Sequence, residues 1–366
     1  MWLVIILFIL ILCAGVAENI RIRRLSDKVP IRILVNGTRG KSSVTRMLVA
    51  ALNGCGIRTF GKTTGSAARF IFPDFSEEPV PRKKGIRMVR EHMMMFENAV
   101  SKDCQAIVCE CMAIREESQK VVGTRLVRPT ITIITNARVD HVDQMGNTVL
   151  ETASVLCSSI GPSTDVYTAD PAVMKCLGDS PVKVHPAGPL TESGKTVLNG
   201  FSFPVHEENL ALVLAVCRDL GLDEAKVLDS VVKAVPDRGM TGSMELRGHV
   251  VVNGFAANDA ESSAVLFNGL DMSEVTVVYG NRADREFRLP YFRKLLESLN
   301  VSDVVVTGDN AAKCVRYFSK VPGAMVRRDD MKDMDAFIDS CRKNIICLGN
   351  IKGAGERMLE VLADAV

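Results

Sequence analysis

Residues 31–43 constrain the fold of this chain more strongly than any other segment. An apolar stretch, residues 31–35, runs into a glycine turn, residues 36–40, and Lys41 and Ser42 then open a helix-like stretch. A strand, a glycine turn and a helix in this order bind phosphate, because free backbone N–H groups and the positive helix end face its oxygens. Val35 stands where the first glycine of a full Walker pattern belongs, so an ordinary turn before a helix is the alternative.

The residue types in this turn predict its contacts. Lys41 would reach the β- and γ-phosphates of ATP, and the hydroxyl of Ser42 would ligate Mg²⁺. The expected nucleotide contacts are Gly37, Thr38, Arg39, Gly40, Lys41, Ser42 and Ser43.

Length and composition narrow the class of protein. The 366 residues suggest two or three domains. The net charge is +2 and the basic residues are scattered, so nothing points to a nucleic-acid partner. The eleven cysteines include no Cys-x-x-Cys pair, and we therefore expect reduced, mostly buried thiols in a cytosolic domain.

The N-terminus predicts a membrane anchor over residues 1–18. Trp2 to Ala17 is an uncharged apolar run that would span ~24 Å as a helix. A secretory signal would carry positive charge before this run, a lipoprotein signal would place a small residue before Cys13, and a core helix would have a polar face. The positive charges that follow predict a single pass with the catalytic part in the cytoplasm; they are Arg21, Arg23, Arg24 and Lys28.

Beyond a polar linker at residues 19–30, strands and helices alternate, which predicts an α/β fold with parallel sheets. We expect an ATP-binding domain over residues 31–245 and a Rossmann-like domain over residues 246–366. The expected strands of the first domain are residues 31–35, 105–111, 130–135 and 165–168, and those of the second are 250–252, 274–279, 303–307 and 344–348. Residues 181–204 are richer in Pro, Gly, Ser and Thr and suggest a looser connection.

Polar groups at strand ends are the remaining candidate site residues of the first domain. Glu110 ends an apolar strand, where a carboxylate is costly unless it is paired or binds metal. His141 lies between Asp140 and Asp143 after the next strand, and imidazole and carboxylate can share Mg²⁺ or position phosphate. A cap or ion pair at Glu110, and a solvated polar turn around His141, are the alternatives.

The second domain has two polar, glycine-containing segments at strand ends, residues 253–259 and 279–285. Arg282 or Arg285 could neutralise phosphate charge in a transition state, or could hold only surface ion pairs. A third such turn spans residues 349–356.

Taken in order along nearly the whole chain, these segments resemble the Mur ligase family, and within it the catalytic subunits of poly-γ-glutamate synthases. The resemblance is carried by residues 36–46, 61–65, 110–113, 140–141, 253–259, 282–285 and 349–351. It implies a phosphate-loop ATP domain, a closing Rossmann-like domain, and γ-glutamyl bond formation through an acyl phosphate.

The resemblance also assigns roles and partners. Lys41 would act in catalysis with Glu110, His141 and Arg285, and Mg²⁺ would be held by Ser42, Glu110 and His141. Asn209 would lie near adenine, and nucleotide contacts are implied for Asn258, Asp259 and Arg282. The implied partners are glutamate, the growing poly-γ-glutamate chain and small membrane subunits, with a homo-oligomer left open.

One position departs from the family. Many Mur ligases carry a carbamylated lysine about fifteen residues after the Asp-His pair, whereas residues 150–157 contain no lysine. Glu151 or water would have to replace it. A ligase for another amino acid and a nucleotide-dependent assembly or transport ATPase remain as alternatives, and no residue signature marks the polymer site.

Overall fold

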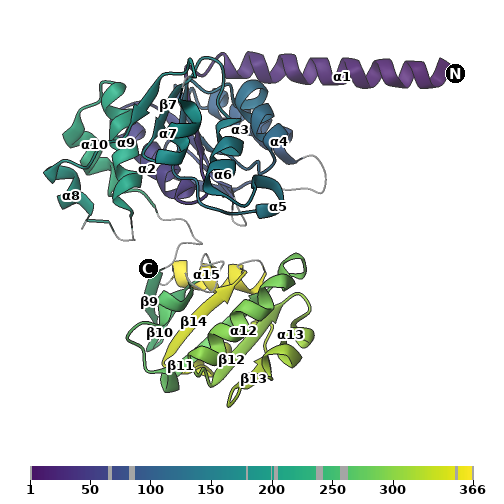
Figure 1. Cartoon of the computed structure of the whole chain (residues 1–366), viewed down its shortest axis with the longest axis vertical. Helices are drawn as coiled ribbons and strands as arrows, with labels where there is room; N and C mark the ends of the chain where they lie inside the picture. The colour runs from purple at the N-terminus through teal and green to yellow at the C-terminus, as the bar shows by residue number, and fades with distance from the viewer. Residues whose placement is uncertain are drawn as a thin grey trace. The chain divides into compact units, whose positions relative to one another are not determined.

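The structure is a computed structural model, and it describes residues 2–64, 68–81, 87–178, 180–198, 200–201, 205–235, 242–255, 263–350 and 353–364. The chain forms two compact units, Met1–Pro236 and Asp237–Val366 (Figure 1). Sequence analysis placed this boundary at 245/246. The structure places it earlier, because the strand β9 (Gly242–Leu246) pairs with the first parallel strand of the second sheet.

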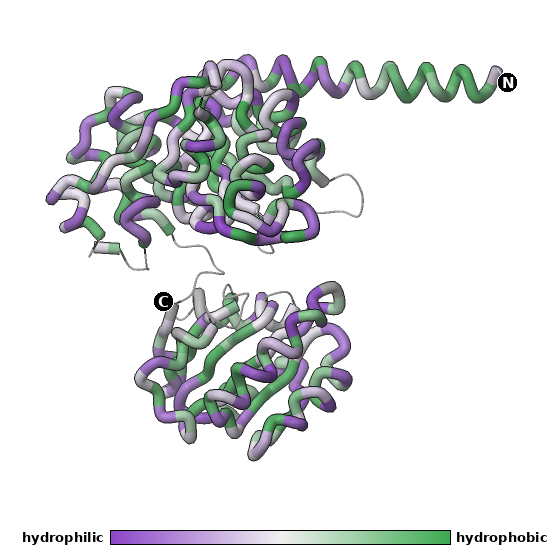
Figure 2. The backbone as a smooth tube through the Cα atoms, in the orientation of Figure 1, coloured by the Kyte–Doolittle hydropathy of each residue, from purple (hydrophilic) through white to green (hydrophobic). Residues whose placement is uncertain are grey.

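A single long helix, α1 (Trp2–Ser26), begins the chain. Its first part is strongly hydrophobic (Figure 2), and it is long and apolar enough to cross a membrane by length and composition. Its most apolar window is not buried inside the protein. The helix runs on through residues 19–26, which we had assigned to the linker. These residues are helical because Ile22 and Ser26 are buried in the first unit and Arg21 pairs with Glu97 at 2.5 Å.

The first unit is built on an eight-stranded sheet of order β4-β3-β2-β5-β1-β6-β7-β8. The six strands from β2 to β8 run parallel, and β3 and β4 add an antiparallel edge. The strands are β1 (Ile31–Asn36), β2 (Thr59–Lys62), β3 (Arg69–Ile71), β4 (Glu77–Pro79), β5 (Ala106–Glu110), β6 (Ile131–Ile134), β7 (Asp165–Thr168) and β8 (Val184–Pro186).

Helices cover this sheet on both faces, as the alternating pattern predicts. Leu34, Ile107 and Cys109 pack with Phe96 and Val122 in one apolar cluster, which Ile22 of α1 joins. The helical elements are α2 (Lys41–Gly54), α3 (Arg87–Ser101), α4 (Glu116–Val121), the π-helical η1 (Val122–Val127), α5 (Val142–Met145), α6 (Val149–Cys157), α7 (Pro171–Leu177), α8 (Glu192–Leu198), α9 (Glu207–Asp219) and α10 (Glu224–Val231).

The second unit contains a six-stranded sheet of order β13-β12-β11-β14-β10-β9, parallel except for β9. Its other strands are β10 (His249–Asn253), β11 (Val275–Asn281), β12 (Asp303–Gly308), β13 (Met325–Arg328) and β14 (Asn344–Gly349). The helical elements are η2 (Val265–Phe267), η3 (Met272–Glu274), η4 (Ala283–Arg288), α12 (Leu289–Ser298), α13 (Ala311–Phe318), α14 (Met334–Asp339) and α15 (Ala354–Asp364). Separate apolar clusters on the two sheet faces confirm the doubly wound, Rossmann-like class.

Candidate functional site

The turn after β1 has the backbone that a phosphate loop requires. Gly37 and Gly40 adopt φ values of 128° and 84°, which side chains other than glycine rarely adopt. A Cβ atom at Gly37 would collide with Thr135, and one at Gly40 would lie 2.7 Å from the amide of Asn209. Both positions therefore require glycine, because of the backbone conformation and because neighbouring atoms approach too closely for a side chain. Asn209, expected near adenine, lies buried against the loop itself.

The end of β6 holds the loop in place. Asn136 Oδ1 accepts from Thr38 Oγ1 at 2.7 Å and from the Arg39 N–H at 3.1 Å. Thr135 Oγ1 donates to the Arg39 carbonyl at 2.6 Å, and the Arg138 N–H donates to Thr38 Oγ1 at 2.9 Å. Sequence analysis assigned no role to Thr135 or Asn136 and missed this contact with the loop. The loop is thus ordered by partners almost a hundred residues away.

Lys41 and Ser42 begin α2 directly after the loop. Lys41 Nζ donates to the carbonyl of Gly37 at 2.6 Å and to that of Thr38 at 3.3 Å, so its ammonium lies over the turn. Ser42 Oγ donates to Glu110 Oε2 at 3.1 Å. The loop lysine, the loop serine and the strand-end carboxylate therefore come together at the carboxyl edge of the sheet, where open α/β sheets bind ligands.

Glu110 is only 4% exposed, yet its carboxylate is well supplied with partners. The pairing of β5 with β1 places it beside Val35, at the base of the loop. Besides Ser42, the backbone N–H of Thr64 donates to Glu110 Oε2 at 2.8 Å. Mg²⁺ prefers oxygen ligands such as hydroxyl and carboxylate groups. It is usually held by one or two carboxylates together with phosphate oxygens. Ser42 and Glu110 fit that role.

His141 lies after β6 with an unusual backbone. Its φ and ψ of 47° and 51° are left-handed, a costly conformation for a residue with a side chain. Its N–H donates to Asp140 Oδ1 at 2.9 Å, and Asp140 faces Arg39 at 3.9 Å. Across the described parts of the chain, no three His, Cys, Asp or Glu side chains form a group able to hold a metal. Any metal there needs ligands beyond Glu110 and His141, such as Ser42 and the phosphates.

Glu151 has a structural role at the start of α6. Its carboxylate accepts from Asn147 N at 2.8 Å and Thr148 N at 2.9 Å, while Thr148 Oγ1 accepts from the Glu151 N–H at 3.2 Å. This is a reciprocal capping box, and its hydrogen bonds hold the pKa of the Glu151 carboxyl below its usual value. The carboxylate is committed to the helix end, so the structure does not support Glu151 as the substitute metal ligand.

A buried ion pair lies beneath the site. Lys62 Nζ, at the end of β2, faces Glu91 Oε2 at 3.1 Å, with the two side chains 0% and 1% exposed. The neighbouring His92 donates from Nδ1 to the Met88 carbonyl, and burial, with Lys62 nearby, lowers its pKa to about 4. Burial also raises the pKa of the Cys111 thiol to about 11. At neutral pH the imidazole is uncharged and this thiol is protonated, so thiolate chemistry is not available here.

The second unit holds the other predicted residues. Arg282 precedes η4 and Arg285 lies within it, both directly after β11. Asn258 and Asp259 lie outside the described residues. Asn281, at the end of β11, donates from Nδ2 to the Asp309 carbonyl at 2.6 Å, and the Asn350 N–H donates to the Gly280 carbonyl at 2.7 Å. Polar groups thus gather at the carboxyl edge of this sheet as well.

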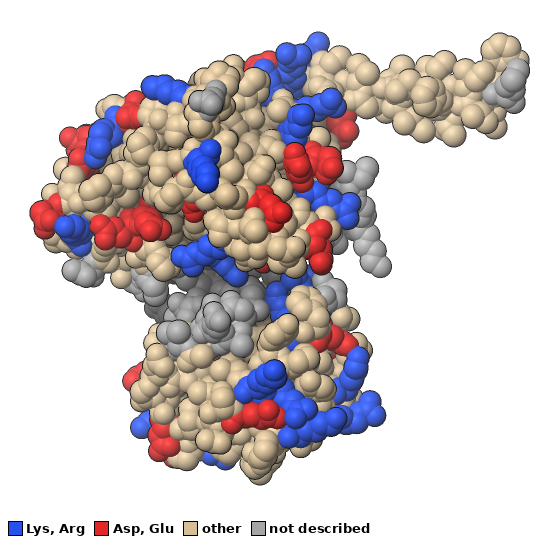
Figure 3. All heavy atoms as spheres, in the orientation of Figure 1, with Lys and Arg blue, Asp and Glu red and all other residues tan. Residues whose placement is uncertain are grey.

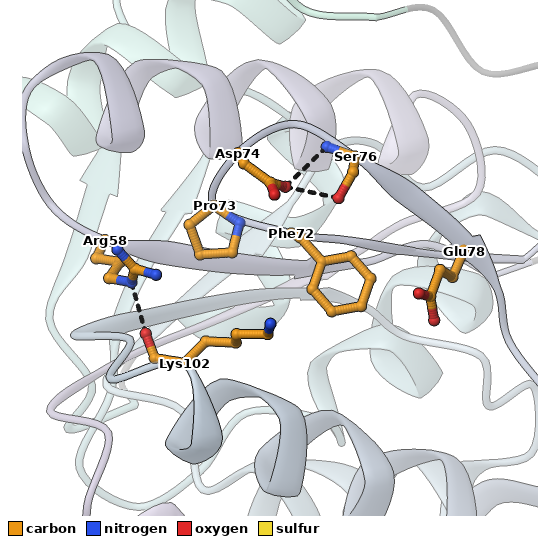
Figure 4. Close-up of a pocket in the computed structure, with 7 residues that line it drawn as sticks. All are labelled: Arg58, Phe72, Pro73, Asp74, Ser76, Glu78 and Lys102. Carbon is orange, nitrogen blue, oxygen red and sulfur yellow. Dashed lines mark hydrogen bonds between the residues drawn. The ribbon is translucent and has the colours of Figure 1, made fainter.

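A separate hollow of about 250 Å³ lies at the other end of the first sheet (Figure 4). Its lining includes Arg58, which precedes β2, and Phe72, which follows β3. Within its lining, Arg58 donates to the Lys102 carbonyl at 2.5 Å, and Asp74 accepts from Ser76. The phosphate loop does not line this hollow.

Comparison with known proteins agrees with this geometry. A family model for the Mur ligase middle domain matches residues 35–186, and one for the C-terminal domain of poly-gamma-glutamate synthase CapB matches residues 241–365. PGA synthase CapB from Bacillus subtilis is 30% identical, covering 98% of this chain and 97% of that protein. Capsule biosynthesis protein CapB from Bacillus anthracis is 28% identical over 92% of this chain and 77% of that protein.

Solved structures support the fold. A folylpolyglutamate synthase from Thermotoga maritima has a TM-score of 0.69 at 14% identity, covering 93% of both chains. One from Mycobacterium tuberculosis, complexed with ADP and AMPPCP, has a TM-score of 0.67 at 17% identity and covers 94% of this chain and 95% of that chain. The sequence matches and the phosphate loop agree: the chain belongs to the poly-γ-glutamate synthase CapB family and is an ATP-dependent amide-bond ligase of the Mur type.

Proposed function

We propose that this chain extends poly-γ-glutamate by activating a carboxylate with ATP and passing the acyl group to an amine. The observation that carries the proposal is the ordered loop at Gly37–Gly40 with Lys41, Ser42 and Glu110 gathered at its side. The homologues of the CapB family support the polymer as product.

The two steps of the proposed reaction explain why a positively charged side chain and backbone N–H groups lie at the loop. In the first step a carboxylate oxygen attacks the γ-phosphorus of ATP, giving an acyl phosphate and ADP. In the second step an amine nitrogen attacks the acyl carbon, phosphate leaves, and the nitrogen loses a proton. Because the first step brings negative charges together, Lys41 and the loop N–H groups lower its barrier. A water-excluding site protects the acyl phosphate from hydrolysis.

Magnesium would be held by Ser42 and Glu110, with His141 as a further ligand. The ion, when bound, neutralises the phosphates and polarises the γ-phosphoryl group. Since Glu151 caps α6, phosphate oxygens or water would be the remaining ligands of the ion in this proposal.

Other residues are proposed in supporting roles. Asn209 would contact the nucleotide from its place against Gly40. From the second unit, Arg282 and Arg285 would neutralise phosphate charge, and Asn258 and Asp259 would contact the nucleotide. We further propose that α1 crosses the cell membrane once, that the basic residues after the apolar run keep the catalytic part in the cytoplasm, and that small membrane subunits are partners.

An oxygen-tracing experiment tests this function. The full chain in detergent is incubated with ATP, Mg²⁺ and glutamate labelled with ¹⁸O in its γ-carboxylate, with a poly-γ-glutamate primer. Ligase chemistry transfers one ¹⁸O atom into the released phosphate, because the bridging oxygen of the acyl phosphate leaves with phosphorus. Release of unlabelled phosphate at the same rate with and without glutamate would instead identify an assembly or transport ATPase.

A further inference from the structure

We propose that α12 and α13 of the second unit bind the acidic polymer along a basic strip, defined here as Arg293, Lys294, Arg316, Tyr317 and Lys320. This inference rests on the proposed function and supplies the polymer site that no sequence signature marks. Figure 3 shows Lys and Arg side chains gathered on this part of the second unit.

Charge is unevenly distributed over α12, α13 and the two residues that follow α13. Residues 289–298 and 311–320 together contain five Lys or Arg and one Asp or Glu, although the chain as a whole is almost balanced at 45 and 43. Lys294, Arg316 and Lys320 are exposed. In the described part of the chain, no carboxylate lies within 4.0 Å of these three cations. Their charge is therefore available to an external anion.

The strip is also held in shape. The guanidinium of Arg293 lies 5.6 Å from the centre of the Tyr317 ring, and Lys320 Nζ lies 6.0 Å from the same ring. Arg293 is further fixed by Glu297 at 2.7 Å. The contact of Arg293 with Tyr317 joins α12 to α13, and Lys320 contacts the same ring from the end of α13.

Exposed apolar surface continues the strip toward the ligand edge of the sheet. Phe287 and Tyr291 are 63% and 62% exposed, and Arg288 lies 5.7 Å from the Phe287 ring. Phe287 lies on η4 and Tyr291 on α12, and these two elements follow the carboxyl end of β11. Each residue of a γ-linked glutamate chain offers one free carboxylate and two backbone methylene groups. Cations beside exposed rings match that alternation of charge and hydrocarbon.

Direct binding tests the strip without turnover. Fluorescent poly-γ-glutamate is titrated with the full chain in detergent and followed by anisotropy. The variant Lys294→Glu/Arg316→Glu/Lys320→Glu should bind at least about tenfold more weakly, because each reversal replaces attraction by repulsion. The control Lys175→Glu/Lys183→Glu/Lys226→Glu makes the same charge change on exposed lysines of the first unit and should lose less than about twofold.

Further arms separate the explanations. The variant Lys294→Arg/Arg316→Lys/Lys320→Arg keeps every charge and should bind normally, and circular dichroism checks that all variants fold. Equal loss in the reversal and control variants would overturn the proposal, as would unchanged polymer binding accompanied by lost binding to phosphatidylglycerol vesicles. Polymer binding through the strip without ¹⁸O transfer would refute the proposed function alone, whereas ¹⁸O transfer with unaltered binding would refute the strip alone.

Discussion

The loop edge of the first unit and the helical surface of the second solve opposite problems. Around Gly40, each group is held in one position. It is held by the backbone conformation, by the close approach of neighbouring atoms and by hydrogen bonds from distant residues. On α12 and α13, long exposed side chains present charge to solvent. A reaction at one phosphorus atom needs fixed dipoles, because reorganisation would add to its barrier. A polymer that carries one carboxylate in every residue needs cations spaced along an exposed surface.

The largest expected effect of a mutation is at Lys41, in the loop of the first unit. Lys41→Ala should lower turnover about a thousandfold, because the loop loses the only ammonium that its side chains provide, at the point where charge develops. Lys343→Ala, an exposed lysine of the second unit outside the strip, is the control and should change turnover less than about twofold. ADP release measures both. Full polymer synthesis by Lys41→Ala would show that the loop is not the reactive centre.

Glu110 and Glu151 allow a carboxylate proposed to bind Mg²⁺ to be compared with one that caps a helix. Glu110→Gln should lower turnover about a hundredfold and shift the Mg²⁺ dependence to higher concentration, since a neutral amide is a poorer ligand. Glu151→Gln makes the same chemical change at a carboxylate that caps a helix, and its amide oxygen can still accept the capping hydrogen bonds, so stability should change little and the Mg²⁺ curve should stay in place. An unchanged Mg²⁺ curve for Glu110→Gln would contradict the metal assignment.

Acid should loosen the first unit before the second. The pKa of His92 is lowered to about 4, whereas an unfolded histidine titrates near 6.5, so the unfolded state takes up more protons in between. Stability contributed by the neutral imidazole is therefore lost as pH falls from about 6.5 toward 4, by up to about 1.4 kcal/mol per pH unit. In the second unit, hydrogen bonds instead lower the pKa values of Glu286, Asp271 and Asp339, whose contribution is lost at more acidic pH.

Hydrogen–deuterium exchange at pH 7 and pH 5 measures this difference unit by unit, after correction for intrinsic exchange rates. Protection should fall in α3 and β5 and hold in β11 and β12. His92→Gln keeps a donor for the Met88 carbonyl but cannot take up a proton, so its loss of protection should be smaller. A second unit that opens first at pH 5 would reverse the prediction.

Ionic strength gives the smallest expected effect. Raising NaCl from low to physiological concentrations should raise KM for the polymer primer a few-fold and KM for ATP by less than about twofold. Exposed charges are screened within about 8–10 Å, whereas partly buried contacts at the loop are screened much less. Equal salt responses for the two substrates would remove the distinction between the two regions.

The sequence was most informative where structure is local. Residues 31–43 predicted a strand, a turn and a helix because the residues that form them follow one another directly in the sequence. Glu110 was predicted because a carboxylate at the end of an apolar strand is unusual. The strands β2, β3, β4, β8 and β13 were missed, because three or four residues give too little alternation to detect. The five-residue antiparallel strand β9 was missed as well.

What depended on distant pairing could not be predicted. The attachment of Asn136 to the loop joins residues 97 and 98 positions apart. Lys62 and Glu91 are distant in the sequence, and only the fold buries them together. One signal was present and overlooked: Thr148 followed three residues later by Glu151 is the pattern of a capping box, and it would have argued against Glu151 as a metal ligand.

The unbroken course of α1 into the first unit has a mechanical consequence. Because the same helix carries the apolar stretch and, through Ile22 and the Arg21–Glu97 pair, packs on the body of the unit, the two cannot swivel independently. With α1 in a bilayer, any tilt or rotation imposed on it by neighbouring membrane helices would turn the whole ATP-binding body.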